Sequence, residues 1–208
     1  ENAALDNLRS RFDLQTLGEI RYPEDNPPRQ ERISLGRLIF FDPILAGEKD
    51  VSCGTCHHPD FAFADRRQFG AGVSGTDLGP DRILTDDGFH LEPRNSQTIL
   101  NTAFNGEQSA TPSADGCQFW DCRVNSLEVQ ATKPVESRVE MKGDAYSGEV
   151  ALDSVLARLQ SIPEYVDRFE QAFPDAAANT PDSERAAVID SSTYARAVAA
   201  YERELVTR

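Results

Sequence analysis

The feature that most constrains this chain is the segment from Val51 to Phe61, VSCGTCHHPDF. Cys53 and Cys56 are separated by two residues, and His57 follows directly. Thiols about one helical turn apart can bond to the two vinyl groups of a haem, and the adjacent imidazole can then bind the iron. Cys-x-x-Cys-His is the attachment signature of c-type haem. The segment therefore predicts a chain that folds around one covalently bound c-type haem.

Zinc sites and redox-active thiol pairs also use cysteines at this spacing. A zinc site with four thiolates would need Cys117 and Cys122, but these have four residues between them, whereas zinc knuckles usually combine two turns of similar spacing. A thioredoxin-like pair would follow a strand-helix pattern, which this sequence lacks. Haem is therefore favoured. Cys117 and Cys122 are then expected to form a local disulfide, with free thiols as the alternative.

Charge and hydropathy narrow the partners and the compartment. The 35 acidic and 21 basic residues give a formal charge of −14, which disfavours nucleic acid and anionic membranes and would suit a basic protein partner, although solubility alone would also explain it. No run approaches the roughly 18 apolar residues of a membrane span. The start, ENAALDNLRS, lacks a signal peptide's apolar core. We expect an exported periplasmic or extracellular-facing bacterial chain, with its signal peptide removed.

Apolar periodicity predicts a mainly α fold with long irregular loops around the haem. Strand alternation and internal repeats are both absent. In the second predicted helix, Ile33, Leu38 and Ile39 could form an inner face. Dense glycine, aspartate and proline indicate a long loop over residues 41–93 and a small, polar surface loop over residues 176–184. The predicted helices cover residues 3–17, 30–40, 98–104 (weakly), 152–159, 165–173 and a final segment from 192.

The residue opposite the proximal histidine separates electron carriers from enzymes. Carriers fill the sixth iron position with methionine or a second histidine, whereas catalytic haems leave it open. Besides His57, the chain has His58, His90 and one methionine, Met141. His58 precedes a proline and is expected in a surface turn. His90 lies in a loop that could approach the distal side, and Met141 lies between two charged residues. An open or water-bound site is therefore a serious possibility.

Five stretches of the chain resemble the di-haem bacterial cytochrome c peroxidases and their MauG-like relatives. They run in family order from Leu35 to Leu205 and read LGRLIFFDPILAGEKDVSCGTCHHPDFAFAD, PRNSQTILNTAFN, FWDCR, LEVQATKPVESRVEM and YARAVAAYEREL. The resemblance implies that residues 1–208 form a single N-terminal domain holding the peroxidatic haem. In the family a second haem domain follows, and it would begin where this chain stops.

The resemblance also implies roles for four further residues. Gln130 and Glu140 match the distal glutamine and the catalytic glutamate, and Trp120 matches the tryptophan that relays electrons between the haems. Asn95 matches a ligand of the calcium ion between the two domains. Taken singly, Trp120 could be a core anchor and Glu140 a solvated carboxylate. The chemistry is consistent with the roles, since a carboxylate above the iron can move a peroxide proton while an amide orients the peroxide.

The chain departs from the family pattern in its loop after the haem segment and in its cysteines. The loop FGAGVSGTDLG lacks the displaceable distal histidine of peroxidases that need reductive activation, so the pocket is expected to be open unless His90 substitutes. This favours the MauG-like branch. Cys122 replaces a glycine usual in the motif FWDGR, and Cys117 accompanies it, which suits a disulfide that stiffens the segment around Trp120.

Several functions follow from these patterns. The first is a haem peroxidase that reduces hydrogen peroxide to water with electrons from a second haem and an external donor. The alternatives are a MauG-like oxidase that modifies aromatic side chains of a partner protein, and a non-catalytic electron-transfer cytochrome c. A zinc-binding interaction module comes last. The expected partners are a second haem-bearing domain or chain, and a small redox protein or protein substrate.

Overall fold

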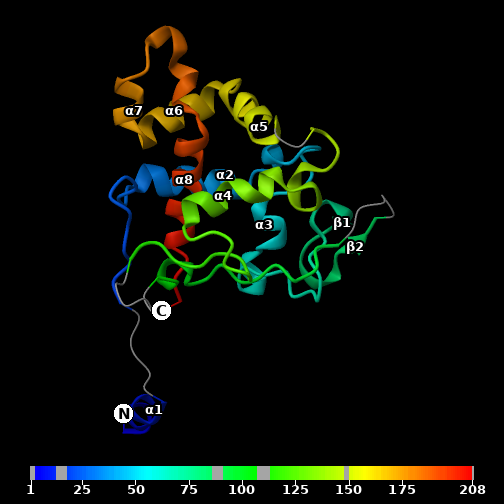
Figure 1. Ribbon diagram of the computed structural model, residues 1–208, viewed down its shortest axis with the longest axis vertical. Coiled ribbons are helices and arrows are strands. Elements are labelled where there is room, and N and C mark those ends of the chain that lie inside the picture. Colours follow the sequence, from blue (N-terminus) through cyan, green and yellow to red (C-terminus); the bar gives the residue numbers. More distant parts are fainter. Residues whose placement is uncertain (1–2, 13–17, 86–90, 107–112, 148–149, 208) are drawn as a thin grey trace.

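The computed structural model describes residues 3–12, 18–85, 91–106, 113–147 and 150–207. These residues form a mainly α fold, as predicted (Figure 1). The α-helices are α1 (Ala3–Phe12), α2 (Gln30–Phe41), α3 (Cys53–Cys56), α4 (Leu127–Glu136), α5 (Ala151–Gln160), α6 (Pro163–Ala172), α7 (Pro174–Ala178) and α8 (Ser191–Arg203). The 3₁₀ turns are η1 (Pro43–Leu45), η2 (Pro59–Phe61), η3 (Gly72–Ser74), η4 (Gly79–Asp81), η5 (Thr102–Phe104) and η8 (Asp182–Val188), and η6 (Arg138–Lys142) is a π-helical turn.

Helix α8 runs through the centre of the molecule and packs against α2 and α4 (Figure 1). Its start is fixed by a capping box, in which the Asp190 carboxylate accepts from Thr193 N at 2.7 Å and Thr193 Oγ1 accepts from Asp190 N at 3.0 Å. Gly36 of α2 lies so close to α8 that a Cβ there would be 1.9 Å from the Ala197 carbonyl oxygen. The two helices can therefore approach only because residue 36 has no side chain.

The inner face of α2 differs from the prediction at one position. Ile39 is fully buried and Ile33 is partly buried, but Leu38 is 38% exposed. Leu35 and Phe40 are buried instead. The helical period places Leu35 one turn before Ile39 on the face that meets α8, whereas Leu38 points outward. Leu38 was therefore wrongly assigned to the core.

The helices after residue 150 form most of the hydrophobic core. The predicted segments 152–159 and 165–173 correspond to α5 and α6, and the final segment corresponds to α8. The prediction of a loop over residues 176–184 was wrong in part, because α7 covers its start and η8 begins at Asp182. Small and polar residues still form short helices here because Ala176 and Ala177 pack against the core.

The described residues of the predicted loop 41–93 form mainly irregular chain around the short helix α3. Its only sheet among the described residues is a two-residue hairpin of β1 (Gly75–Thr76) and β2 (Ile83–Leu84). The weak helix predicted over residues 98–104 is reduced to the single turn η5, because Ile99 N donates to Phe63 O in the long loop. The periodicity did not predict α4, whose ten residues include Pro134.

Helix α1 lies apart from the rest of the described chain (Figure 1). It confirms residues 3–12 of the predicted helix, and residues 13–17 lie outside the described part. The apolar side chains Leu5, Leu8 and Phe12 are 47–59% exposed, and the helix buries no residue. Within the described residues, no helix combines the length and the apolar character that crossing a membrane requires.

Candidate functional site

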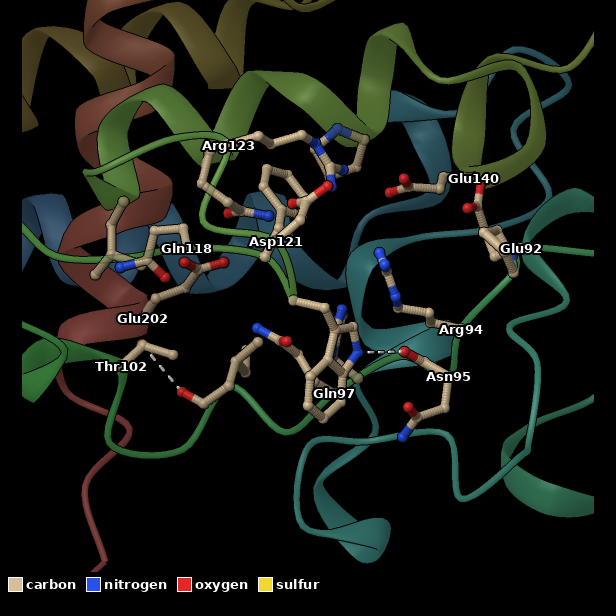
Figure 2. Close-up of a pocket in the computed structure, with 18 residues that line it drawn as sticks. Glu92, Arg94, Asn95, Gln97, Thr102, Gln118, Asp121, Arg123, Glu140 and Glu202 are labelled. Atoms are coloured by element: carbon tan, nitrogen blue, oxygen red, sulfur yellow. Dashed lines mark hydrogen bonds and ion pairs between the residues drawn. The ribbon is translucent and has the colours of Figure 1, made fainter.

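Two adjoining cavities lie between α3, α4 and α8. Their volumes are about 400 Å³ and about 60 Å³. The larger opens towards the rim formed by residues 118–123, and the smaller reaches Cys53 and Cys56. The residues lining both are His57, Glu92, Ile99, Gln130, Pro134, Glu140 and Glu202. The fold therefore gathers His57 and the predicted distal residues on walls that the two cavities share, and Figure 2 shows the residues around the larger cavity.

Local hydrogen bonds orient His57 at the end of α3. Its backbone N–H donates to Cys53 O at 2.9 Å, which closes the turn that carries both cysteines. Its Nδ1 lies 3.1 Å from Phe63 O, and because a carbonyl oxygen can only accept, Nδ1 carries the proton. Burial lowers the pKa of His57. The neutral ring therefore keeps the lone pair of Nε2 for a metal, in the arrangement typical of ligating histidines.

The two cysteines of α3 are free thiols that face the smaller cavity. Burial raises the pKa of both Cys53 and Cys56, so both are protonated. Cys53 packs against the hydrophobic core, whereas Cys56 Sγ accepts from Arg82 Nη1 at 3.4 Å. The second guanidinium nitrogen, Arg82 Nη2, donates to Gly72 O at 2.7 Å. Arg82 thus fastens the loop after the haem segment to the cysteine turn.

A π-helical turn presents Glu140 to the cavities. Helix α4, which carries Gln130, ends two residues after Pro134, and Ser137 starts η6 by accepting from Glu140 N at 3.2 Å. Gly72, at φ +49°, lies against this turn, and a Cβ there would be 1.9 Å from Val139 O. Single π-helical turns are frequent at functional sites because they redirect a side chain out of the helical register. Here the turn places Glu140 beside the cavity.

The carboxyl group of Glu140 exchanges between its protonated and ionised forms near pH 7. Burial raises its pKa to about 7, the charge of Glu92 adds to the increase, and Arg123 opposes it. A group with such a pKa can both donate and accept a proton near pH 7. Gln130, on the preceding helix α4, supplies an amide to the same cavity. This pair can therefore orient a small polar molecule and exchange a proton with it.

Trp120 and Asn95 meet at the rim of the larger cavity. The indole Nε1 donates to the Asn95 carbonyl oxygen at 3.1 Å, as Figure 2 shows by a dashed line. Trp120 is 56% exposed, so it is not a core anchor. Cys117 and Cys122 form the expected disulfide, with Cα atoms 4.6 Å apart. The zinc interpretation is therefore wrong, because these sulfurs are bonded to each other.

The three candidates for a sixth ligand have different outcomes. His58 is the turn residue that we expected, since its Nδ1 accepts from Asp60 N at 3.3 Å at the start of η2. His90 lies outside the described residues. Met141 does not have the polar setting that its neighbours suggested: it is 3% exposed, belongs to the core and lines the smaller cavity. The π-helical turn directs it inward beside Glu140.

Sequence reasoning missed two acidic residues of the site, Glu92 and Glu202. Both line both cavities. Glu202 lies on α8 next to Arg203, whose guanidinium pairs with Glu128 instead. Burial raises the pKa of Glu202 to about 8, with Arg203 opposing and Glu128 adding to the increase. Both residues stand within the stretches that resemble the family or directly before one, but nothing in their spacing indicates a shared cavity.

The residues of the cavity wall fit a covalent haem better than a metal cluster. Two free thiols and a neutral imidazole come from positions 53, 56 and 57 of one turn, and two cavities lie beside them. Among the described residues, no three His, Cys, Asp or Glu side chains come together as a metal site. The cavity walls offer apolar contacts from Ile99 and polar groups such as Gln118 and Arg123, which suits a flat amphipathic group.

The comparisons with known proteins agree with this geometry. The di-haem cytochrome c peroxidase family matches residues 30–208. The cytochrome c551 peroxidase of Pseudomonas aeruginosa is 33% identical over 87% of this chain and 41% of its own length. The methylamine utilization protein MauG of Paracoccus denitrificans is 36% identical over 81% of this chain and 39% of its own length. The chain spans about two fifths of the length of the curated relatives it matches.

Solved structures give the same picture of the fold. A MauG-like protein associated with microbial copper homeostasis superposes with a TM-score of 0.65 at 25% identity, over 94% of this chain and 47% of that one. The diheme peroxidase BthA of Burkholderia thailandensis superposes with a TM-score of 0.57 at 21% identity, over 87% of this chain and 40% of that one. The second likeness concerns the fold alone.

Proposed function

This chain belongs to the di-haem cytochrome c peroxidase family, and we propose that it is the half of such an enzyme that reacts with peroxide. In this proposal residues 1–208 form one N-terminal domain. It carries one c-type haem through Cys53, Cys56 and His57. The enzyme reduces hydrogen peroxide to water with electrons from a second haem, borne by another domain or chain, and from an external donor.

One observation carries the proposal. Glu140, with a pKa raised to about 7 by burial, lines the same cavity as His57 and the two free thiols. An electron carrier needs no titratable carboxyl group beside its haem, whereas peroxide cleavage needs a group that moves a proton between the two oxygens. Gln130 on the same cavity wall supports an additional role in orienting the peroxide.

The residues of this chain then have separate tasks. A haem bound here would supply a ferric iron that accepts a peroxide oxygen and passes electrons. His57, oriented by Phe63 O, would bind the iron. Glu140 would take a proton from one oxygen of the peroxide and return it to the other oxygen, which leaves as water. The Gln130 amide would hydrogen-bond the peroxide in the required orientation, and Trp120 would relay electrons at the rim.

Replacing Glu140 by glutamine tests the proposal. The Glu140→Gln side chain keeps its size but cannot exchange a proton, so we expect peroxide turnover to fall about 100-fold or more. Covalent haem should be retained, because Glu140 does not contact the attachment turn through any hydrogen bond described. Steady-state peroxide consumption with a small reduced c-type cytochrome as donor measures the rate.

Glu136→Gln is a matched control for this test. Glu136 ends α4 four residues earlier, pairs with Lys133 and lines neither cavity. Its variant should therefore keep the parental rate. Equal rates for Glu140→Gln and Glu136→Gln would refute the assignment of Glu140.

A second candidate is a MauG-like oxidase acting on aromatic side chains of a partner protein. Two features favour it: the described loop 69–79 contains no histidine that could close the distal site, and Trp120 is 56% exposed beside the larger cavity. An exposed indole could exchange electrons with a docked protein as well as with a second haem. Peroxide assays with a small cytochrome donor distinguish the two, because a MauG-like oxidase would reduce peroxide slowly with this donor.

The third candidate, a non-catalytic electron carrier, depends on Met141. Its inward position in the smaller cavity would be consistent with a methionine ligand. An optical spectrum of the ferric protein separates the candidates. A high-spin band that changes on adding peroxide supports the enzyme, whereas a low-spin spectrum in both redox states supports the carrier.

The remaining parts of the proposal concern the surroundings of this domain. Asn95 would contribute a side-chain ligand to a calcium ion at the boundary with the second haem domain. Its position beside Trp120 supports this, since both residues lie at the open rim of the larger cavity. Two closely spaced cysteines held as a disulfide support an exported protein in an oxidising compartment such as the periplasm.

A further inference from the structure

We propose that Glu92 is a proton relay that connects Glu140 with solvent and supplies the protons used in peroxide reduction. This inference rests on the proposed function. It concerns a residue that the family motifs in this chain do not include. Its basis is the placement of two carboxyl groups at one end of the haem cavity.

Glu92 and Glu140 come from distant parts of the chain and meet at the cavities. Both line the larger and the smaller cavity, and Figure 2 draws their side chains at the same end of the space. The two carboxyl groups interact electrostatically, because the charge of Glu92 contributes to the raised pKa of Glu140. A proton on Glu140 is therefore stabilised by the negative charge of Glu92.

One loop holds both carboxyl groups in place. Glu92 N donates to Gly70 O at 2.9 Å, and Gly70 N donates to Arg94 O at 2.9 Å, so Gly70 holds the backbone of residues 92 and 94 through two hydrogen bonds. Gly72, two residues after Gly70, packs against the backbone of the π-helical turn that carries Glu140. The loop therefore connects the backbone that carries Glu92 with the backbone that carries Glu140.

The charged groups that face Glu140 are few among the described residues. Glu92 raises its pKa and Arg123 lowers it. Burial raises the pKa of the Cys53 and Cys56 thiols, the charge of Glu140 adds to the increase, and both thiols are protonated. Arg123 is itself engaged, since it pairs with Asp121 at 2.9 Å and lies over the Phe119 ring. Glu202 of α8 also lines both cavities, but Glu92 is the acid whose charge raises the pKa of Glu140, and it is therefore the neighbour from which we expect Glu140 to receive a proton.

The stoichiometry of the reaction sets the number of protons that the relay must supply. Reduction of one hydrogen peroxide consumes two protons and two electrons and yields two waters, and the electrons come from the donor of the proposed function. In each transfer a proton leaves the Glu92 carboxyl group for the Glu140 carboxylate. The Glu92 carboxylate then takes a proton from bulk water, to which it is partly exposed.

Three variants of the haem-loaded, full-length protein test the relay. Glu92→Gln removes the titratable group with little change in size, and we expect peroxide turnover to fall about tenfold or more. Glu92→Asp retains a carboxyl group and should recover part of the rate. Glu24→Gln, at an exposed position that lines neither cavity, should keep the parental rate.

Chemical rescue separates a proton relay from a structural role. Formic acid or imidazolium at millimolar concentration can enter an open cavity and deliver protons, so each should raise the rate of Glu92→Gln and leave that of Glu140→Gln low. A structural defect would not respond to small acids. A rate for Glu92→Gln that equals the parental rate, or a reduced rate that no small acid restores, would overturn the relay.

An infrared titration provides a readout independent of turnover. The carboxyl band that disappears in Glu140→Gln reports the pKa of Glu140, and Glu92→Gln should lower this pKa because a like charge is removed. An unchanged pKa would also overturn the relay. Failure of the proposed function has a different signature: the unaltered protein would then lack peroxide turnover, whereas failure of the relay leaves turnover intact and sensitive to Glu140→Gln.

Discussion

The two cysteine pairs of this chain lie in different parts of the site and have different chemistry. Cys53 and Cys56 line the inner wall as free thiols, and Cys53 packs against the hydrophobic core. Cys117 and Cys122 bracket the outer rim as a disulfide, where Trp120 is exposed. The inner pair is positioned by packing from distant helices, whereas the outer pair is positioned by a bond within its own short loop.

The difference shows how the cavity combines a reactive wall with a rigid rim. Phe119 and Cys122 both adopt positive φ angles, +63° and +54°, which non-glycine residues rarely do. The disulfide between Cys117 and Cys122 closes the short loop that contains Phe119, and it keeps the rim in this conformation. The inner wall has no such bond and leaves its thiols available. Variants of each cysteine pair and of Glu202 test this difference between the inner wall and the outer rim, in order of decreasing effect.

Removing the inner pair should abolish haem attachment. The Cys53→Ala/Cys56→Ala variant has no thiol left on the cavity wall, so we expect no covalent haem after denaturation and extraction with acidified acetone. Absorbance of the pyridine complex measures the covalent haem. The Cys117→Ser/Cys122→Ser variant is the matched control and should retain it. Loss of covalent haem from both variants would contradict the division of roles between the two pairs.

Removing the outer pair should affect stability instead. A disulfide that closes a loop of this length restricts the unfolded chain, and its loss should lower the free energy of unfolding by about 2 kcal/mol. Urea denaturation of the haem-loaded protein measures this change. We expect the rim to loosen as well, which Trp120 fluorescence reports because this is the only tryptophan of the chain. A variant as stable as the parent would show that packing alone holds the rim.

Titration of Glu202 should make stability depend on pH at the inner wall. Burial raises its pKa in the folded protein to about 8 from an ordinary value of 4.5. Between these values the folded state holds a proton that the unfolded state has released, so the free energy of unfolding falls as the pH rises. From pH 5 to pH 8 we expect the parent to lose at least about 1 kcal/mol more than Glu202→Gln.

Denaturation with urea at both pH values checks this effect. Glu184→Gln, at an exposed position, is the control and should keep the pH dependence of the parent. If Glu202→Gln also lost stability in parallel with the parent, Glu202 would not be the group responsible. The same comparison distinguishes the inner wall, where burial governs the carboxyl groups, from the exposed surface.

Much of the fold and the centre of the site could be predicted from the sequence. The spacing of Cys53, Cys56 and His57 predicted a turn that presents two thiols and an imidazole, and α3 with the residue that follows it forms such a turn. Helical periodicity predicted α5, α6 and α8, because an apolar stripe of that length must be buried. Periodicity failed at α4, whose interior contains Pro134 and whose exposed face includes the apolar Val129.

The sequence by itself determined the turn that carries Cys53, Cys56 and His57, the main helices and the family, because each depends on residues that are close together or occur in a fixed order. Only the tertiary structure decided which distant side chains share the cavity. It turned Met141 inward despite its charged neighbours, and it brought Glu92 and Glu202 to Glu140's cavity from a loop and from α8. The physical reason is that burial and charge act through space: a carboxyl group's pKa depends on what surrounds it after folding, which spacing along the chain does not encode.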